Sequence, residues 1–113
     1  MKMVIAIIQP HKLDDVLKAL DDREIYLKTV TSVLGCGRQK GVSEVYRGVK
    51  EAGNLLKKVK LEIAINDQYL KQTVEAISTA ARTGKVGDGK IFVLNLEECY
   101  RIRTGETDGV AIG

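Results

Sequence analysis

Residues 58–65, KVKLEIAI, carry a large aliphatic side chain at every odd position and a charged or small one at every even position. This alternation is typical of a β-strand that turns one face toward a hydrophobic core. Asn66 or Asp67 can cap a helix directly after the strand. The apolar stripe expected along that helix comprises Leu70, Val74, Ile77 and Ala81. The stretch therefore predicts a strand that leads into an amphipathic helix.

The rest of the chain predicts a similar alternation of strands and helices. Residues 3–8, MVIAII, are apolar on both faces and predict a central strand. Residues 11–22 repeat apolar side chains at helical spacing, and residues 27–34, rich in Val and Thr, predict another strand. Residues 91–96 predict a buried strand, and residues 100–104 a short fifth strand before a glycine-rich polar tail.

The order of these elements is β-α-β, a long loop, then β-α-β. This order predicts an α+β fold, a ferredoxin-like βαββαβ sandwich with two helices on one face of an antiparallel sheet. Nothing in the sequence covers the other sheet face, and Ile5, Ile7 and Ile63 suggest that this face is apolar too. A large apolar sheet face does not stay exposed to water, so we expect a homo-oligomer that packs sheet against sheet.

The segment between the two units, residues 37–56, has no clean periodicity and contains four glycines. A loop of this length in so small a domain is usually functional or disordered. We therefore expect residues 37–56 to form a long loop without regular structure. The length of 113 residues fits a single domain, residues 1–113.

Composition excludes several classes of function. The net charge of +3 is too small for a general nucleic-acid binder, and five aromatic residues without Trp disfavour a base-stacking surface. The chain has no apolar run of membrane-spanning length and no signal-peptide pattern, so we expect a cytoplasmic protein. Cys36 and Cys99 are too few for a zinc site, and His11 is expected to be a surface residue.

The strongest chemical motif is RTGKVGDGK, residues 82–90. Three glycines in six residues can turn backbone N–H groups toward one ligand, and Lys85 and Lys90 add positive charge, which suits a phosphate group. The motif is not a Walker P-loop, because the GxxxxGK[ST] spacing is missing and a strand follows. Taken alone, it is equally consistent with a glycine hairpin that carries solvated lysines.

Two further basic motifs are RIR, residues 101–103, and GRQKG, residues 37–41. On a strand, Arg101 and Arg103 would lie on one face about 7 Å apart, and arginine favours bidentate contacts with phosphate or carboxylate. GRQKG offers a mobile backbone, two cations and one amide. The alternatives are a solvent-facing row of charges and a floppy basic loop.

Together these motifs point to a known family. GRQKG (37–41), YRG (46–48), TGKVGDGKIFV (83–93) and RIRTGE (101–106) occur in this order. On these motifs, and along essentially its whole length, the sequence resembles the PII nitrogen-regulatory signal-transduction family. The resemblance implies a homotrimer of ferredoxin-like subunits with nucleotide sites in the clefts between subunits.

The resemblance also implies which residues bind ATP or ADP. The expected nucleotide-binding residues are Thr29, Gly35, Gly37, Arg38, Glu62, Ala64, Gly87, Asp88, Gly89, Lys90, Arg101 and Arg103. The segment 87–90 would hold the phosphates, and Arg101 and Arg103 would reach them from the neighbouring subunit.

A second ligand, 2-oxoglutarate, is implied as well. The expected residues are Gln39, Lys40, Gly41, Lys58 and Gly87. Gln39 would ligate a Mg²⁺ ion shared by ATP and 2-oxoglutarate, and Lys58 would pair with a carboxylate of 2-oxoglutarate. Mg²⁺ prefers oxygen ligands such as the Gln39 amide, and the charges of both anions need cations once they are buried.

The long loop departs from the family pattern. Where the family usually reads YRGAEY, residues 46–51 read YRGVKE, so Glu51 replaces the tyrosine that is modified and Val49 replaces a phosphorylated serine. This predicts a purely ligand-driven sensor. The resemblance implies that residues 37–56 form a flexible, protruding loop that docks onto a partner protein, with expected contacts at Glu44, Tyr46 and Arg47. The expected target is an ammonium transporter or a nitrogen-assimilation or nitrogen-fixation enzyme, with a membrane reached only through a transporter.

Two other classes of function are less consistent with the sequence. An ATP-hydrolysing enzyme needs a positioned general base, but His11 is remote from the glycine motif and Asp88 is expected to be a turn residue. A metal-binding trimer of the copper-tolerance type would need more histidine or cysteine ligands. A PII-like sensor of a different small molecule stays an alternative. We expect a regulator that is not an enzyme.

Overall fold

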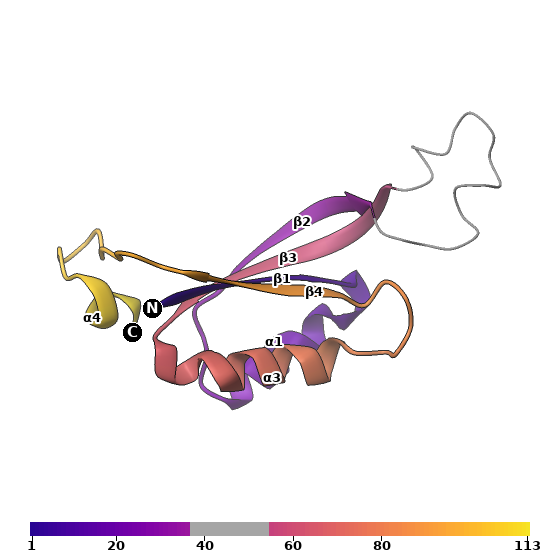
Figure 1. Ribbon diagram of the computed structural model, residues 1–113, viewed down its shortest axis with the longest axis horizontal. Helices are drawn as coiled ribbons and strands as arrows, with labels where there is room; N and C mark the ends of the chain where they lie inside the picture. Colours follow the sequence, from indigo (N-terminus) through magenta and orange to yellow (C-terminus); the bar gives the residue numbers. More distant parts are fainter. Residues whose placement is uncertain (37–54) are drawn as a thin grey trace.

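The computed structural model describes residues 1–36 and 55–113 (Figure 1). Its elements are β1 (Lys2–Ile8), η1 (Pro10–Lys12), α1 (Leu13–Asp22), β2 (Thr29–Cys36), β3 (Leu55–Ile65), η3 (Asp67–Tyr69), α3 (Leu70–Ala81), β4 (Gly89–Asn95) and α4 (Asp108–Ile112). Among the described residues, no helix is long and apolar enough to cross a bilayer.

The four strands form one antiparallel sheet in the order β2-β3-β1-β4. Helices α1 and α3 lie side by side on one face of this sheet (Figure 1). This is the ferredoxin-like arrangement, so the predicted fold class is confirmed. Strand β1 lies in the interior of the sheet, where Ile8 is opposite Val59 on β3 and Gly89 on β4.

The core lies between the sheet and the two helices. The strands β1 and β3 contribute Val4, Ala6, Ile8, Val59, Leu61, Ile63 and Ile65, all buried. The helices contribute Val16, Leu20, Ala76, Ile77 and Ala81. The alternation predicted for residues 58–65 is confirmed, because every odd position there is buried.

The second sheet face carries no helix in the described part of the chain. Residues paired across antiparallel strands share a face, so the pairs Ile5–Phe92 and Met3–Leu94 place apolar side chains on it. Phe92 is half exposed in the single chain. The expectation that this face is apolar holds along β1 and β4. It is wrong for Ile63, which pairs with Val4 in the core.

Strand β3 gives the same face its charges, because its even positions from residue 58 to residue 62 are charged. Lys60 and Glu62 face this side opposite Ile7 and Ile5, and their side-chain charges lie 4.0 Å apart. The open face is therefore apolar toward β4 and charged toward β3.

The predicted fifth strand is wrong. Residues 101–104 form a turn, with one isolated bridge between Tyr100 and Thr107. Two backbone hydrogen bonds close it: Gly105 N–H donates to the Arg101 carbonyl at 2.8 Å, and Arg101 N–H donates to the Glu106 carbonyl at 2.9 Å. Gly105, with a φ of 76°, allows the chain to reverse. The predicted polar tail contains α4.

The predicted loop boundary is also corrected. Strand β3 begins at Leu55, whereas the loop was expected to extend to residue 56. The remainder of the expected loop, residues 37–54, lies outside the described residues.

Neither predicted cap residue makes a side-chain cap at the start of η3 or α3. Asn66 instead donates its side-chain amide to the Gly109 carbonyl at 3.2 Å. Asp67 accepts a hydrogen bond from the N-terminal amino group at 2.9 Å. Both side chains bind distant segments, which local sequence does not reveal.

Candidate functional site

The glycine motif forms the connection between α3 and β4, with its backbone in conformations that suit glycine. Gly84, Gly87 and Gly89 have φ angles of 86°, 103° and 106°. At Gly89, a Cβ atom would lie 1.7 Å from the carbonyl oxygen of Ile7. Only glycine fits there, because the backbone at the start of β4 lies very close to the end of β1, with which it pairs.

Asp88 stabilises this glycine loop (residues 82–90) through hydrogen bonds within the loop. Its carboxylate accepts hydrogen bonds from the backbone N–H of Thr83 at 2.8 Å and of Gly84 at 2.9 Å, and from the Thr83 hydroxyl. The Thr83 hydroxyl bond, followed by the backbone bonds, lowers the pKa of Asp88 despite an opposing effect of burial. Asp88 is thus a turn residue, and its carboxylate is already engaged within the loop.

Lys58 brings strand β3 to the same place. The side chain is 8% exposed, and its Nζ donates a hydrogen bond to the Gly87 carbonyl at 3.0 Å. Gly35 on β2 lies beside the Lys58 stem: a Cβ at Gly35 would be in ordinary van der Waals contact with the Lys58 Cγ, at 3.5 Å. Three segments that are distant in sequence therefore meet at one end of the sheet.

Lys90 adds a second cation to this end. It is exposed and lies opposite Ile7, directly after Gly89. Lys58 and Lys90 give this end of the sheet a positively charged corner suited to an oxyanion. The N–H groups of Thr83, Gly84 and Lys85 are bound within the loop. An ammonium group has three donors, and the Gly87 carbonyl takes one of those on Lys58.

Three other predicted residues lie farther along the open sheet face. Thr29 on β2 pairs with Glu62 on β3, and Ala64 on β3 pairs with Met3. The glycine loop meets β1 at Ile8, five residues from Met3, or about 17 Å along a strand. One chain therefore does not bring the two groups of residues into contact.

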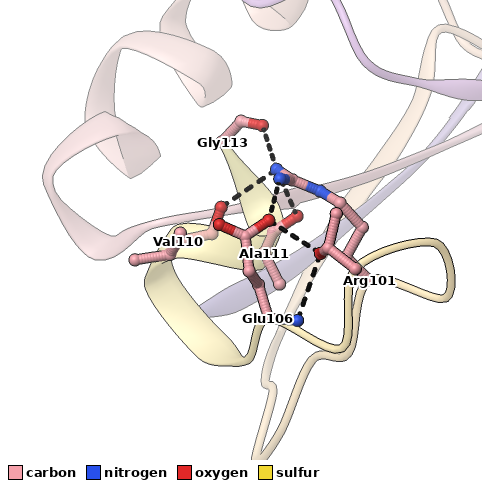
Figure 2. A network of polar contacts seen from close by, with 6 residues as sticks. Arg101, Glu106, Val110, Ala111 and Gly113 are labelled. Carbon is pink, nitrogen blue, oxygen red and sulfur yellow. Dashed lines mark hydrogen bonds and ion pairs between the residues drawn. The ribbon is translucent and has the colours of Figure 1, made fainter.

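Arg101 lies beyond the other end of β4 in the sequence and contacts α4 (Figure 2). The seven residues of β4 span about 20 Å, so the glycine loop is out of reach of Arg101 in the same chain. The prediction that Arg101 and Arg103 share a strand face is wrong, because both lie in the turn that Gly105 closes. Arg103 is exposed in that turn.

Figure 2 shows what Arg101 binds instead. Its guanidinium donates to the carbonyls of Val110 and Gly113 at 3.1 Å each and of Ala111 at 3.4 Å. It also pairs with the Glu106 carboxylate, which accepts a hydrogen bond from the Thr104 hydroxyl at 2.7 Å. The Thr104 bond and the Arg101 charge lower the pKa of Glu106.

Comparison with known proteins adds an independent observation. The family profile described as "Nitrogen regulatory protein P-II" matches residues 1–106. The chain belongs to the P-II family. It is 52% identical, over 99% of its length, to the nitrogen regulatory protein P-II of Rhizobium etli and to the nitrogen regulatory protein GlnK of Escherichia coli K12, and covers all of both. It is 53% identical to nitrogen regulatory protein GlnK1 of Methanosarcina mazei, with 99% of this chain and 97% of GlnK1 covered.

Several predicted site residues lie outside the described part of the chain. These are Gly37, Arg38, Gln39, Lys40, Gly41, Glu44, Tyr46 and Arg47. Sequence reasoning missed Thr83 and Glu106, which position Asp88 and Arg101. Each of these two residues lies five positions from the residue that it binds, and this short spacing was the sequence feature that could have identified them.

Proposed function

We propose that this P-II protein is a non-enzymatic regulator that binds ATP or ADP between the subunits of a homotrimer. The observation that carries the proposal is the positively charged corner that Lys58 and Lys90 form beside the glycine loop. Two ammonium groups suit a polyphosphate better than a neutral ligand. The close approach at Gly89 keeps the backbone in this shape before any ligand binds.

Two features of the single chain support an assembly of identical subunits, as in the proposed trimer. The open sheet face carries the apolar pairs Ile5–Phe92 and Met3–Leu94, which a second copy of the chain can cover. Arg101 lies at the opposite end of β4 from the glycine loop, so a site that uses both needs two subunits. In a ring of three identical subunits, each interface would combine the glycine loop of one subunit with Arg101 of the next, which gives three equivalent sites.

The proposal includes 2-oxoglutarate and Mg²⁺ as effector ligands. The amide oxygen of Gln39 is a suitable ligand for Mg²⁺, and Lys40 and Gly41 extend the same motif. Lys58 keeps donors beyond its bond to Gly87, and they can pair with a carboxylate of 2-oxoglutarate. Bound ATP, Mg²⁺ and 2-oxoglutarate would thus share one cleft.

We propose that ligand binding changes the conformation of the loop formed by residues 37–56, and that this conformation controls the target. Glu44, Tyr46 and Arg47 are proposed to contact the target in the cytoplasm. We propose an ammonium transporter or a nitrogen-assimilation or nitrogen-fixation enzyme as that target. Since Glu51 replaces the modified tyrosine, bound ligands alone would select the loop conformation.

Calorimetry with ADP, ATP and ATP plus Mg²⁺ and 2-oxoglutarate tests the proposal. We expect both nucleotides to bind, ATP to bind more tightly with 2-oxoglutarate, and phosphate to be released far more slowly than an ATPase would release it. Sustained, rapid release of phosphate would favour an enzyme. Nucleotide binding that ignores 2-oxoglutarate would favour a sensor of another small molecule.

A further inference from the structure

The guanidinium of Arg101 is engaged within its own chain. Three of its four side-chain partners are backbone carbonyls at the end of α4, those of Val110, Ala111 and Gly113 (Figure 2). The last carbonyls of a helix have no partner within the helix and form the negative end of its dipole. Arg101 therefore caps the C-terminus of α4 with both hydrogen bonds and charge.

Glu106 keeps Arg101 in this position. Its carboxylate pairs with the guanidinium and also accepts the Thr104 hydroxyl at 2.7 Å, so it is itself oriented. The Arg101 and Glu106 side chains are 30% and 41% exposed, which leaves the pair open to an incoming anion. A bound phosphate would use the same N–H groups that now bind carboxylate and carbonyl oxygens.

The two ends of α4 are held differently. At its start, the Asp108 N–H donates to the Cys99 carbonyl at 2.7 Å, and Asn66 binds the Gly109 carbonyl at 3.2 Å. Three hydrogen bonds from Arg101 reach residues 110–113. A helix of five residues is too short to persist without such contacts. Removal of Arg101 from the carbonyls should therefore free residues 110–113 while the start of α4 stays attached.

Ile112 and Gly113, which belong to the segment that Arg101 holds in place, also line a cavity. This cavity of about 460 Å³ lies beside the end of β3, and its walls include Ala64, Tyr69, Ile112 and Gly113. Ala64 is one of the residues proposed for the adenosine side. If residues 110–113 were released, the cavity would lose the wall formed by Ile112 and Gly113 and would open near Ala64.

We infer that α4 is a latch, because its carbonyls and a nucleotide phosphate compete for the Arg101 guanidinium. The inference rests on the proposed nucleotide site and adds a mechanism that regulates it. A nucleotide that binds through Arg101 must displace residues 110–113, and the docked latch in turn weakens nucleotide binding. Linkage requires the two effects to be equal in free energy.

Affinity for ADP tests the latch through a shortened chain that ends at Gly109. This chain loses all three carbonyls but keeps both anchors at the start of α4. We expect it to bind ADP about fivefold more tightly or better, within the usual range of coupling between sites. Because Arg101→Ala is itself expected to weaken ADP binding, the shortening should leave that weakened affinity unchanged in this background. The gain should persist in a Lys57→Ala control, since Lys57 is exposed and outside the proposed site.

Hydrogen exchange of the full-length chain gives a second readout. ADP should speed exchange at the amides of residues 110–113, and adenosine, which has no phosphate, should leave it unchanged. If the native chain binds ADP but shortening leaves the affinity unchanged and residues 110–113 stay protected, the latch is wrong and the proposed function stands. If the native chain binds neither ADP nor ATP, both fall together.

Discussion

Lys58 and Gly87 lie 29 positions apart in the sequence, and a hydrogen bond of 3.0 Å from the Lys58 ammonium to the Gly87 carbonyl joins them. Lys58 is also one of two buried polar or charged side chains in the described part of the chain; the other is Thr73. A buried ammonium group is costly unless a polar partner accepts its hydrogen bonds. The contact therefore fixes both the lysine and the glycine loop, and a cation is in place where an anion is proposed to bind.

Replacement of Lys58 should separate the two proposed ligands. Lys58→Met keeps an apolar stem but removes the donor to Gly87, so we expect a loss of about 1 kcal/mol in the free energy of unfolding. ADP should still bind, and 2-oxoglutarate should no longer strengthen ATP binding. Urea unfolding and calorimetry measure the two effects. Lys57→Met, at the exposed neighbouring position, is the control; equal losses in both variants would contradict a specific role for Lys58.

Gln39 is predicted to act with Lys58 but on the metal. Gln39→Ala removes the proposed oxygen ligand of Mg²⁺, so calorimetry should show normal ADP binding and no effect of 2-oxoglutarate on ATP. Gln39→Glu retains an oxygen ligand and should keep part of the effect. An undiminished 2-oxoglutarate effect in Gln39→Ala would remove this residue from the site.

Gly89→Ala is predicted to be far more damaging than other changes in the glycine loop. A Cβ at Gly89 would overlap the Ile7 carbonyl, and we expect a loss of stability of about 3 kcal/mol or more. Gly84 also has a positive φ, but its surroundings are open, so Gly84→Ala should lose only about 1–2 kcal/mol. Thermal unfolding of both variants checks the order. Equal effects would show that β4 does not approach β1 this closely.

The pH dependence of the glycine loop should follow Asp88. The pKa of Asp88 is lowered in the folded chain. The ionised carboxylate therefore stabilises the loop fully at pH values above the ordinary pKa of an aspartate, about 3.9. That contribution is lost as the pH falls through the lowered folded pKa. Thr83→Val removes the strongest donor, and an NMR titration of Asp88 should then give a higher pKa. An unchanged pKa would mean that the Thr83 hydroxyl does not hold the carboxylate.

The sequence predicted those features of the fold that depend on regular patterns. The alternation of residues 58–65 and the helical spacing after it were enough for β3 and α3, because burial of one face dictates both patterns. The glycine loop was predicted from its residue types, and the structure adds that Asp88 and Lys58 fix its shape.

Features that depend on distant contacts were not predictable in this way. Residues 100–104 alternate like a strand, but backbone hydrogen bonds of Arg101 close a turn there. The Arg101 guanidinium binds carbonyl oxygens of α4. Asn66 has the chemistry of a helix cap and instead binds Gly109, 43 positions away. In both cases the side chain could form several different hydrogen bonds, and the partner that it binds lies in another segment of the chain.

The central claim is that one nucleotide site combines the glycine loop of one subunit with Arg101 of the next. Lys90→Glu and Arg101→Glu each damage one half of every site, so calorimetry should show little ADP binding by either variant alone. When the two variants are coexpressed, random assembly of a three-membered ring should leave about one site in four with both halves intact. The account predicts that the mixture regains ADP binding at that fraction with native affinity. A mixture that binds no better than the separate variants, or a native chain that sediments as a monomer, would contradict it.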